Sequence, residues 1–367
     1  MRILVIERGP FGTLIDAAKL CEYVGRDHSV TYLSFNASLF MNQARDEVSH
    51  PFVKLVKVQT HPKFIVRSWR WFLACLREVR EDYDVVCVYH FRGCSLLRCV
   101  RPRRPMILDI RSGGVSPSAF KRRVANMTIR FDAKFFRNVA IISDGLRRQL
   151  GVAARKAHIL PLGADQFELP AKTFKDFHLL YLGNFYRVRK LETTIRAFAR
   201  LYHECGSSVD MTYTMVGGSE GQEAAFLQQV AFDAGVSHVM RFPGFVPHER
   251  VVDFLATCNA GMSYVPITDF FDHQPPTKTF EYLMAGMPVL ATGTVENRKL
   301  ITEINGIVTG DSEDEVFAGL RSLLATRDRF DSQEIHRSIQ QYSWENIVLK
   351  NCLPYLREIV QDSRSHT

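Results

Sequence analysis

Residues 275–292 read PPTKTFEYLMAGMPVLAT, and their types and spacing suit the binding of an anionic ligand. Proline is tolerated at the start of a helix but not inside it, so the pair at 275–276 predicts a helix start that Thr277 or Thr279 can cap. Gly286 and Pro288 end this short helix, and an apolar run typical of a buried parallel strand follows. The N–H groups at such a helix start bind anions, phosphate above all.

Glu281 lies about one turn inside this predicted helix. Both Glu281 and Lys278 lie outside its apolar face. A carboxylate at that depth can accept hydrogen bonds from the hydroxyls of a ligand whose phosphates lie at the helix start. An ordinary helix–strand unit with a surface glutamate explains the same spacing equally well.

A second group of candidates follows the strand predicted over 177–183. That strand ends at Gly183, and the loop after it carries Arg189 and Lys190 ahead of an amphipathic helix. Cations in this loop match a diphosphate in charge, and arginine can hold two oxygens at once. Gly217 ends the next predicted strand, where the backbone can approach a ligand closely a second time.

Polar residues also follow predicted strands in the first half of the chain. His90 follows one strand, and Asp109 and Arg111 stand at the end of the next. Ligands of open α/β sheets lie outside the carboxyl ends of the strands, so these three side chains should point towards one crevice. Each of them alone is more often structural. Gly12 lies in the loop after the first strand, where a plain connection is as good an explanation as a binding site.

The elements that position these residues alternate between strands and helices, which predicts an α/β fold with parallel sheets. The alternation begins with a strand over 2–6 and lapses over 166–176, which makes that stretch the best candidate boundary. We therefore predict an N-terminal Rossmann-like domain over 1–167, a second over 168–340 and a C-terminal helix within 341–367.

The composition fits a globular protein, with 367 residues of which 46% are hydrophobic and 23% charged. A formal charge of +8 favours anionic partners, namely sugar nucleotides, phospholipid surfaces or nucleic acid. The eight cysteines form no Cys-x-x-Cys pair, which argues against a metal knuckle. The sequence shows neither a secretory signal nor an apolar stretch long enough to cross a bilayer, so we expect a cytoplasmic protein.

Two stretches mix basic and aromatic residues. Residues 61–80 combine Trp69, Trp71 and Phe72 with lysine and arginine, which suits either a core-packed helix with a solvated basic face or an interfacial helix on anionic lipid. Residues 98–137 repeat the mixture, and their basic clusters suit an anionic membrane, nucleic acid or a solvated face.

The run P-x-K-x-F-E-Y-x-x-A-G-x-P-V within 275–292 resembles the donor-site segment of nucleotide-sugar-dependent retaining glycosyltransferases of family four, which have the GT-B fold. The resemblance implies that Glu281 holds the ribose hydroxyls of the donor, with Thr277, Lys278 and Thr279 at the helix start as further donor-binding residues. Many members carry a second glutamate eight positions earlier that contacts the transferred sugar. His273 stands there in this chain.

Other segments extend the resemblance, most strongly over 177–350. Arg189 takes the place of the family's phosphate-binding lysine, and Lys190 takes that of the glycine after it. The loop at Phe245 and Val246 corresponds to the one that passes the nucleobase. The strand ending at Arg111 is similar to the segment that meets the transferred sugar or the donor phosphate, which makes Arg111 and His90 candidates for the sugar or acceptor side.

The resemblance implies two facing Rossmann-like domains with an interdomain cleft, and a final helix that crosses back onto the first domain. It also implies transfer of a hexose from a nucleotide-diphosphate sugar to a saccharide or lipid-linked acceptor, with retention at the anomeric carbon. Neither a metal nor another cofactor is expected, and the loop residues Asp269, Asp272 and His273 are weak metal candidates. Peripheral attachment to the inner face of the cell membrane is compatible with the basic and aromatic clusters.

Three kinds of alternative remain open: a non-catalytic GT-B protein, another GT-B enzyme and a nucleic-acid-binding protein. A GT-B protein that binds a sugar nucleotide without catalysis would explain the missing first glutamate, and a nucleotide-sugar epimerase would use the same fold. A phosphorylase would need a cofactor lysine site, for which the sequence offers no candidate. A nucleic-acid-binding protein is suggested only by the basic charge, and no nucleic-acid partner is expected.

Overall fold

The computed structural model describes residues 1–36, 50–218 and 221–365, which form two compact units. Unit 1 comprises Met1–Leu162 together with Trp344–Thr367, and unit 2 comprises Gly163–Ser343. The chain leaves unit 1 after Leu162, and its last segment from Trp344 onward belongs to unit 1 again.

Unit 1 is built on a parallel sheet of seven strands in the order β3-β2-β1-β4-β5-β6-β7. The strands are β1 (Arg2–Ile6), β2 (Ser29–Phe35), β3 (Val53–Val58), β4 (Val85–Tyr89), β5 (Met106–Ile110), β6 (Asn138–Ile141) and β7 (Ala157–Ile159). In the centre, Ile3 of β1 pairs with Val30 of β2 and Val85 of β4. Since β1 and β4 are neighbours far apart in sequence, the strand order reverses between them, and this is where parallel sheets bind ligands.

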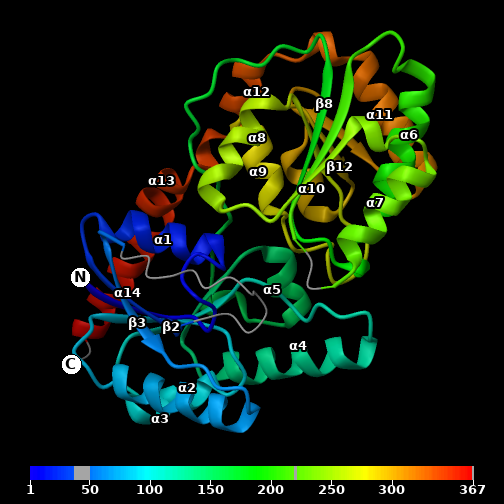
Figure 1. The fold of residues 1–367 in the computed structure, drawn as a ribbon. Coiled ribbons are helices and arrows are strands. Elements are labelled where there is room, and N and C mark those ends of the chain that lie inside the picture. Colours follow the sequence, from blue (N-terminus) through cyan, green and yellow to red (C-terminus); the bar gives the residue numbers. More distant parts are fainter. Residues whose placement is uncertain (37–49, 219–220, 366–367) are drawn as a thin grey trace. The chain divides into compact units, whose positions relative to one another are not determined.

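Helices cover both faces of this sheet, as its largely apolar central strands require. They are α1 (Ile15–Gly25), α2 (Phe64–Glu78), η1 (Cys94–Leu96), α3 (Leu97–Val100), α4 (Ala119–Lys134), α5 (Asp144–Leu150), η2 (Ala154–Lys156), α13 (Trp344–Ile347), the π-helical turn η8 (Val348–Cys352) and α14 (Leu353–Ser365). Figure 1 shows α2, α3 and α4 along one face of the sheet, and α1 with α14 on the other.

Unit 2 repeats the architecture with six parallel strands in the order β10-β9-β8-β11-β12-β13. The strands are β8 (Phe177–Leu182), β9 (Met211–Val216), β10 (Met240–Gly244), β11 (Ala260–Ser263), β12 (Val289–Thr292) and β13 (Gly306–Thr309). Here the order reverses between β8 and β11, where Leu180 pairs with Gly261.

The helices of unit 2 fall into two groups around its sheet (Figure 1). The first group is α6 (Glu192–Cys205), α7 (Glu223–Asp233) and α11 (Glu313–Ala325), and the second is α8 (Val251–Thr257), α9 (Thr277–Met284) and α12 (Ser332–Ile339). The remaining helical segments are η3 (Arg187–Arg189), η4 (Ser237–Val239), η5 (His248–Arg250), α10 (Val295–Leu300), η6 (Arg327–Arg329) and η7 (Gln340–Tyr342). Phe198, Tyr213 and Leu320 lie in the core between the first group and the sheet, fully buried.

The helix predicted within 61–80 forms, but its packing differs from the simple core interpretation. Trp71 and Cys75 are buried, whereas Phe64 is 66% exposed and Trp69 is 64% exposed. The helix therefore keeps one apolar stripe for the sheet and a second for the surroundings.

The C-terminal segment packs on unit 1 through its apolar face. Trp344 of α13 is buried, and α13 contacts α1 while α14 contacts β4. Asn351 Oδ1 lies 2.8 Å from His158 Nε2, and the Tyr355 ring stacks on the same imidazole with centroids 3.9 Å apart. The single long helix expected here is interrupted by the π-helical turn η8.

Candidate functional site

Helix α9 begins at Thr277, directly after Pro276, and no side chain caps it. The expectation that Thr277 or Thr279 caps the first turn is therefore wrong. Thr279 is fully buried, and its hydroxyl lies 2.6 Å from Ser263 Oγ and donates to Asn297 Oδ1 at 3.1 Å. This threonine fastens the helix to β11 and α10, which leaves the N–H groups of the helix start to a ligand or to water.

The position of α9 is fixed by a contact between residues one hundred positions apart. The Leu182 N–H at the end of β8 donates to the Tyr282 hydroxyl at 2.7 Å. A side chain at Gly261 of β11 would collide with the Tyr282 ring, because an added Cβ would lie 2.4 Å from it. The absence of a side chain at 261 thus lets α9 lie close over the switch point of the sheet.

Lys278 is a buried basic residue at this switch point. Its side chain is 5% exposed, and its Nζ lies over the Tyr181 ring, 3.6 Å from the centroid. A Cβ at Gly183 would lie 3.8 Å from the same nitrogen. Burial holds the pKa of Lys278 well below its usual value, and repulsion by Arg189 lowers it further, while Glu281 raises it in part.

Glu281 is 8% exposed and lies near a histidine that the sequence does not indicate. His248 Nδ1 is 3.9 Å from Glu281 Oε1, and its Nε2 is 3.1 Å from Asp165 Oδ2. The imidazole therefore stands between two carboxylates. No motif marks His248, because it lies on η5, between the loop at Phe245 and helix α8.

The loop after β8 separates its cations. Arg189 lies by the Phe271 ring, with 5.8 Å from its guanidinium carbon to the centroid, and it is close enough to Lys278 and Tyr181 to shift their pKa values. Lys190 is exposed and has a φ of 49°, the only positive φ of a non-glycine residue in the described part of the chain. Arg187 instead stacks on Phe226, 3.7 Å from the ring centroid.

Two glycine turns meet beside this loop. A Cβ at Gly217 would lie 1.9 Å from the Gly183 carbonyl oxygen, so only glycine fits there. The Phe185 N–H donates to the Gly218 carbonyl at 2.9 Å, which ties the two turns together. Phe245 lies next to Gly218, because a Cβ added at Gly218 would lie 3.3 Å from the Cβ of Phe245. The Phe245 side chain is 42% exposed.

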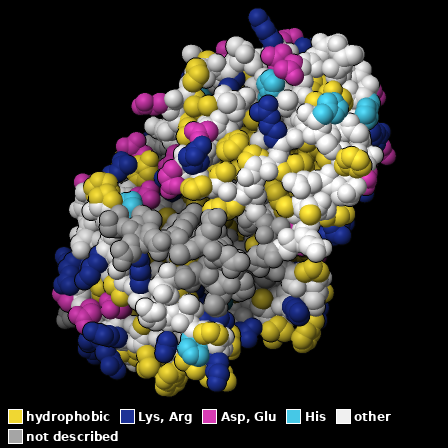
Figure 2. All heavy atoms as spheres, in the orientation of Figure 1, with side chains coloured by type: hydrophobic (Ala, Val, Ile, Leu, Met, Phe, Trp, Pro, Cys, Tyr) yellow, Lys and Arg dark blue, Asp and Glu magenta, His cyan; other side chains and the backbone are white. Residues whose placement is uncertain are grey.

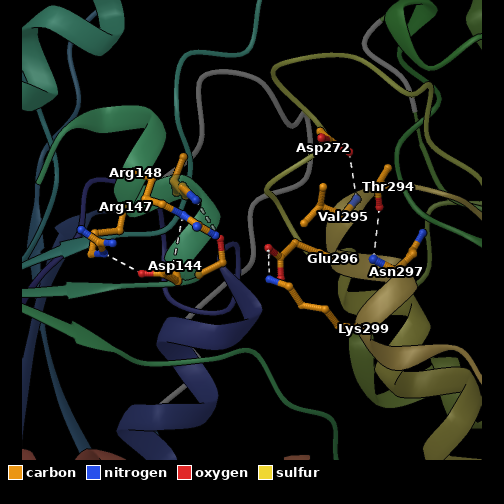
Figure 3. Close-up of polar contacts among 11 residues, drawn as sticks. Asp144, Arg147, Arg148, Asp272, Thr294, Val295, Glu296, Asn297 and Lys299 are labelled. Carbon is orange, nitrogen blue, oxygen red and sulfur yellow. Dashed lines mark hydrogen bonds and ion pairs between the residues drawn. The ribbon is translucent and has the colours of Figure 1, made fainter. Parts of the chain in front are cut away.

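The loop that carries His273 is anchored on α10. Asp272 Oδ1 accepts from the Val295 N–H at 2.8 Å, and Thr294 caps the same helix by accepting from the Asn297 N–H at 3.2 Å (Figure 3). His273 is partly buried beside this anchor. Val246, the second residue expected near the nucleobase, is partly buried too.

Arg111 of unit 1 lies in a buried cluster of charges. Its Nε is 2.7 Å from Asp109 Oδ1 and 3.3 Å from Asp16 Oδ2, and its Nη1 donates to the Leu160 carbonyl. Burial would lower the pKa of Arg111, but the two carboxylates outweigh it and raise that pKa. Burial also raises the pKa of Asp109 to about 6, against the opposing effect of Arg111. Both partners of Arg111 thus come from elements around the first switch point.

His90 lies in a separate network at the end of β4. Its Nε2 is 3.1 Å from Asp132 Oδ2, and the same carboxylate accepts from the Gly93 N–H and the Ser95 hydroxyl. Together with Cys94, the side chains of His90 and Asp132 form the only metal-compatible group among the described residues. Asp132 already caps the turn at η1, so the cluster has a structural explanation.

Glu7 is a further candidate in unit 1 that the sequence analysis does not single out. It follows β1, and its Oε2 accepts from the Tyr32 hydroxyl at 3.0 Å. Burial raises the pKa of Glu7 to about 7. Gly12, in the same loop, has a φ of 83°, which favours glycine. A glutamate directly after the first strand is the signal that could have indicated this group.

The predicted residues therefore divide between the units. In unit 2 the structure gathers Gly183, Gly217, Arg189, Lys278 and Glu281 around the carboxyl ends of β8 and β11. In unit 1 it places Arg111 and His90 in separate networks. Their roles in binding and catalysis stay predictions.

The comparisons with known proteins agree with this architecture. Residues 176–326 match the family described as glycosyl transferases group 1. No curated protein sequence matches the chain. In the described part of the chain, no helix combines the length and apolar character needed to span a membrane.

Solved structures match nearly the whole chain at low sequence identity. The sucrose-phosphate synthase of Thermosynechococcus elongatus has a TM-score of 0.78 and 16% identity, with 98% of this chain and 100% of that chain covered. Anabaena HepE in complex with UDP-glucose has a TM-score of 0.72 and 13% identity, with 100% of both covered. The lipopolysaccharide outer core galactosyltransferase WaaB has a TM-score of 0.67 and 12% identity, with 99% and 100% covered. The expected GT-B fold, with its two Rossmann-like units, is confirmed.

Proposed function

We propose that this chain, which carries a glycosyl transferases group 1 segment at 176–326 within a GT-B fold, transfers a hexose from a nucleotide-diphosphate sugar. The HepE structures contain UDP or UDP-glucose, and WaaB is a galactosyltransferase, which supports a nucleotide sugar as the donor. The transfer proceeds with retention of the anomeric configuration.

The observation that carries the proposal is the pair of cations at the switch point of unit 2. Lys278 is buried and is repelled by Arg189, so its charge is costly in the free protein. A diphosphate placed between these cations and the start of α9 would offset that repulsion. A site arranged in this way is already organised for negative charge before the ligand arrives.

We propose a partner for each part of the donor. The diphosphate contacts Arg189, Lys278 and the uncapped N–H groups of α9, with Lys190 as a second cation from the loop. Glu281 accepts hydrogen bonds from the ribose hydroxyls. The glycine turns at Gly183 and Gly217 let the backbone approach the donor closely. Phe245 and Val246 flank the nucleobase.

The chemical step needs charge stabilisation more than a strong base. The bond from the anomeric carbon to the diphosphate oxygen breaks, and a bond to an acceptor hydroxyl oxygen forms. The acceptor proton passes to the departing phosphate. A preorganised donor that stabilises the leaving oxygen is worth about 3 kcal/mol, and here Arg189 and Lys278 supply this charge. We propose that no metal ion or other cofactor is required.

The acceptor is a saccharide or a lipid-linked saccharide bound to unit 1, in the cytoplasm or at the inner face of the cell membrane. Arg111 and His90 are the proposed sugar-side or acceptor-side residues, and Arg111 would act through the charged cluster it forms with Asp109 and Asp16. His273 contacts the transferred sugar from the loop anchored on α10.

The proposal is tested by substituting Glu281 and measuring donor binding and transfer. A thermal-shift screen of UDP-, GDP- and ADP-sugars should identify one class that stabilises the protein, because a ligand at one hundred times its Kd stabilises the folded state by about 2.7 kcal/mol. Glu281→Ala should lose this stabilisation and most of the transfer activity. Hydrogen bonds to a charged group contribute about 1.5–3 kcal/mol, so affinity should fall roughly tenfold or more.

Glu303→Ala is the matched control, because Glu303 is an exposed glutamate of the same unit. It should bind the donor as the native protein does. Donor binding and transfer that are unchanged in Glu281→Ala would rule out the assigned site. Tight donor binding without any release of nucleoside diphosphate to a panel of acceptors would favour the alternative of a non-catalytic sugar-nucleotide-binding protein, for which His273 at the first glutamate position is the argument.

A further inference from the structure

Helix α2 exposes a stripe of apolar side chains away from the sheet. Ile65 is 80% exposed, Trp69 64% and Leu73 47%, and these three recur at i, i+4 and i+8. The same helix buries Trp71 and Cys75 against the sheet. Two apolar faces on one helix mean that core packing accounts for only one of them.

Helix α4 repeats this arrangement. Met127, Phe131 and Phe135 recur at the same spacing and are each at least half exposed, and Phe120 in its first turn is 75% exposed. Phe131 and Phe135 also contact each other, with ring centroids 5.2 Å apart. A large exposed apolar stripe of this kind marks an interaction surface more often than chance.

The two stripes belong to one layer of unit 1. Helix α2 contacts α3, and α4 contacts η1, whose Leu96 is 54% exposed. Figure 1 shows α2, α3 and α4 on the same face of the sheet. In Figure 2, hydrophobic and basic side chains lie side by side at the lower edge of the view, where Figure 1 places α2. We call the outward side of α2, η1, α3 and α4 the outer layer.

The charge of the outer layer is one-sided. Its exposed cations alternate with the apolar stripes, and they are Lys63, Arg70, Arg77, Lys121, Arg123, Arg130 and Lys134. Across α2, η1, α3 and α4, which the structure describes throughout, no aspartate or glutamate is exposed: Glu78 is partly buried and Asp132 is buried. By contrast, Arg147 and Arg148 of α5 pair with Asp144 at 2.6 and 3.2 Å (Figure 3). The cations of the outer layer have no such acidic neighbours on their own helices.

We propose that the outer layer is a docking surface for an anionic phospholipid bilayer. Aromatic and aliphatic side chains enter the boundary between headgroups and acyl chains, and the cations around them contact the lipid phosphates. Only the biological purpose of this docking rests on the proposed function. A protein held on the membrane by unit 1 meets a lipid-linked acceptor in the plane of the bilayer.

Two other partners fit the surface less well. Nucleic acid would use the cations, but it offers no apolar phase for side chains such as Ile65, Leu73 and Met127, which lack the flat rings that stack on bases. A second copy of this chain would bring an equally basic layer against the first, and like charges repel. An anionic bilayer satisfies both the charge and the apolar surface.

The test is flotation of the full-length protein with phosphatidylcholine vesicles that contain or lack phosphatidylglycerol. The native protein should float with the anionic vesicles and not with the neutral ones, less strongly as salt rises. The double variant Trp69→Ala/Phe120→Ala removes apolar contacts, and Arg70→Glu/Arg123→Glu reverses two charges. Both variants should float less than the native protein. The charge reversals should lower the vesicle partition coefficient about thirtyfold or more, since each of the two lost cations contributes about 1 kcal/mol near an anionic surface.

Matched controls come from unit 2. Phe232 is 69% exposed and Arg196 is exposed, so Phe232→Ala and Arg196→Glu remove comparable groups elsewhere and should float as the native protein does. No flotation with anionic vesicles, equal losses in the controls, or displacement from vesicles by an oligonucleotide at equal phosphate concentration would overturn the proposal. Thermal shift with the donor in every variant separates this outcome from a failure of the proposed function, because the donor residues lie in unit 2.

Discussion

Lys278 shows how a single buried charge can serve binding at a cost to stability. An ammonium group on an aromatic ring gains a cation–π interaction, yet it loses water and faces another cation at Arg189. The depressed pKa of this lysine expresses that balance. If the charge of Lys278 serves binding rather than the fold, an apolar side chain of similar length should replace it without loss of stability.

The expected result for Lys278→Met is a more stable unit 2 that binds the donor poorly. Replacing a buried charge by an apolar side chain is neutral or stabilising, here by on the order of 1 kcal/mol. Hydrogen exchange of β8 and β11 measures the stability, and titration with the donor measures the binding. Lys175→Met is the control for an exposed lysine of the same unit, and should change neither. A destabilised variant with normal donor affinity would show that Lys278 is structural.

Glu7 predicts a pH dependence of unit 1. Its pKa in the folded protein is about 7, above the ordinary value of 4.5, because burial disfavours the carboxylate. The folded state therefore holds a proton that the unfolded state releases, and the stability that this proton contributes is lost as the pH rises from about 4.5 through about 7.

In Glu7→Gln this loss should be absent. Relative to the native protein, the variant should gain roughly 2 kcal/mol between about pH 5 and about pH 8. All three tryptophans, at positions 69, 71 and 344, belong to unit 1, so fluorescence during urea unfolding reports on this unit alone. Glu81→Gln changes an exposed glutamate of the same unit and should leave the pH dependence as it is. Parallel curves for Glu7→Gln and the native protein would contradict the assignment.

At the scale of elements, the loop between β8 and α6 is held in a conformation that its sequence resists. Lys190 has a left-handed backbone, with a φ of 49°, at the place where the resembled family has glycine. A non-glycine residue in this region costs roughly 1 kcal/mol. The loop therefore carries a charge next to the proposed diphosphate position at some cost in backbone energy.

Substitutions at 190 should separate backbone from charge. Lys190→Gly should leave unit 2 as stable as the native protein or slightly more stable, because relief of strain offsets the larger entropy of the unfolded chain. Lys190→Val should destabilise it by about 1 kcal/mol or more, since a β-branched residue fits this region worst. Hydrogen exchange of the α6 amides measures the stability of unit 2 in both variants. If the charge contributes to donor binding, both variants lose affinity equally; a loss in Val alone would assign the effect to the backbone.

At the scale of the whole molecule, the chain returns to unit 1 after completing unit 2. Trp344 stands at this return, with 1% of its surface exposed. Helices α13 and α14 complete the cover of one face of the first sheet, so the stability of unit 1 depends on residues that come last in the sequence.

Trp344→Ala should destabilise unit 1 by about 3–5 kcal/mol, the usual cost of removing a buried large aromatic side chain. Fluorescence of the remaining tryptophans gives the urea midpoint. Leu349→Ala, at a position that is 53% exposed in the same segment, should have little effect. Amide protection in α1 should fall together with that midpoint, whereas protection in α6 of unit 2 should not. Equal losses in both units would show that they unfold as one.

Local patterns in the sequence determined the elements and the ends of several of them. Alternating strands and helices predicted two parallel sheets, and Gly286, with a φ of 70°, ends α9 where the pattern placed its end. The candidates in unit 2 could be found because a motif keeps glycine, cation and carboxylate at fixed spacings. Such signals act within a few residues, through backbone conformation and helix periodicity.

Contacts between distant residues were decided by the tertiary structure alone. Thr279 could cap its helix on spacing grounds, but its hydroxyl is bound by Ser263 and Asn297 instead. His248 lies 33 positions before Glu281, and no periodicity connects them, yet packing of η5 beside α9 places the imidazole 3.9 Å from the carboxylate. Arg111, expected to face a ligand, is neutralised by Asp109 and by Asp16, which lies almost one hundred residues earlier. The energy of a buried charge depends on which groups the whole fold brings around it, and that arrangement is not encoded in any short stretch of sequence.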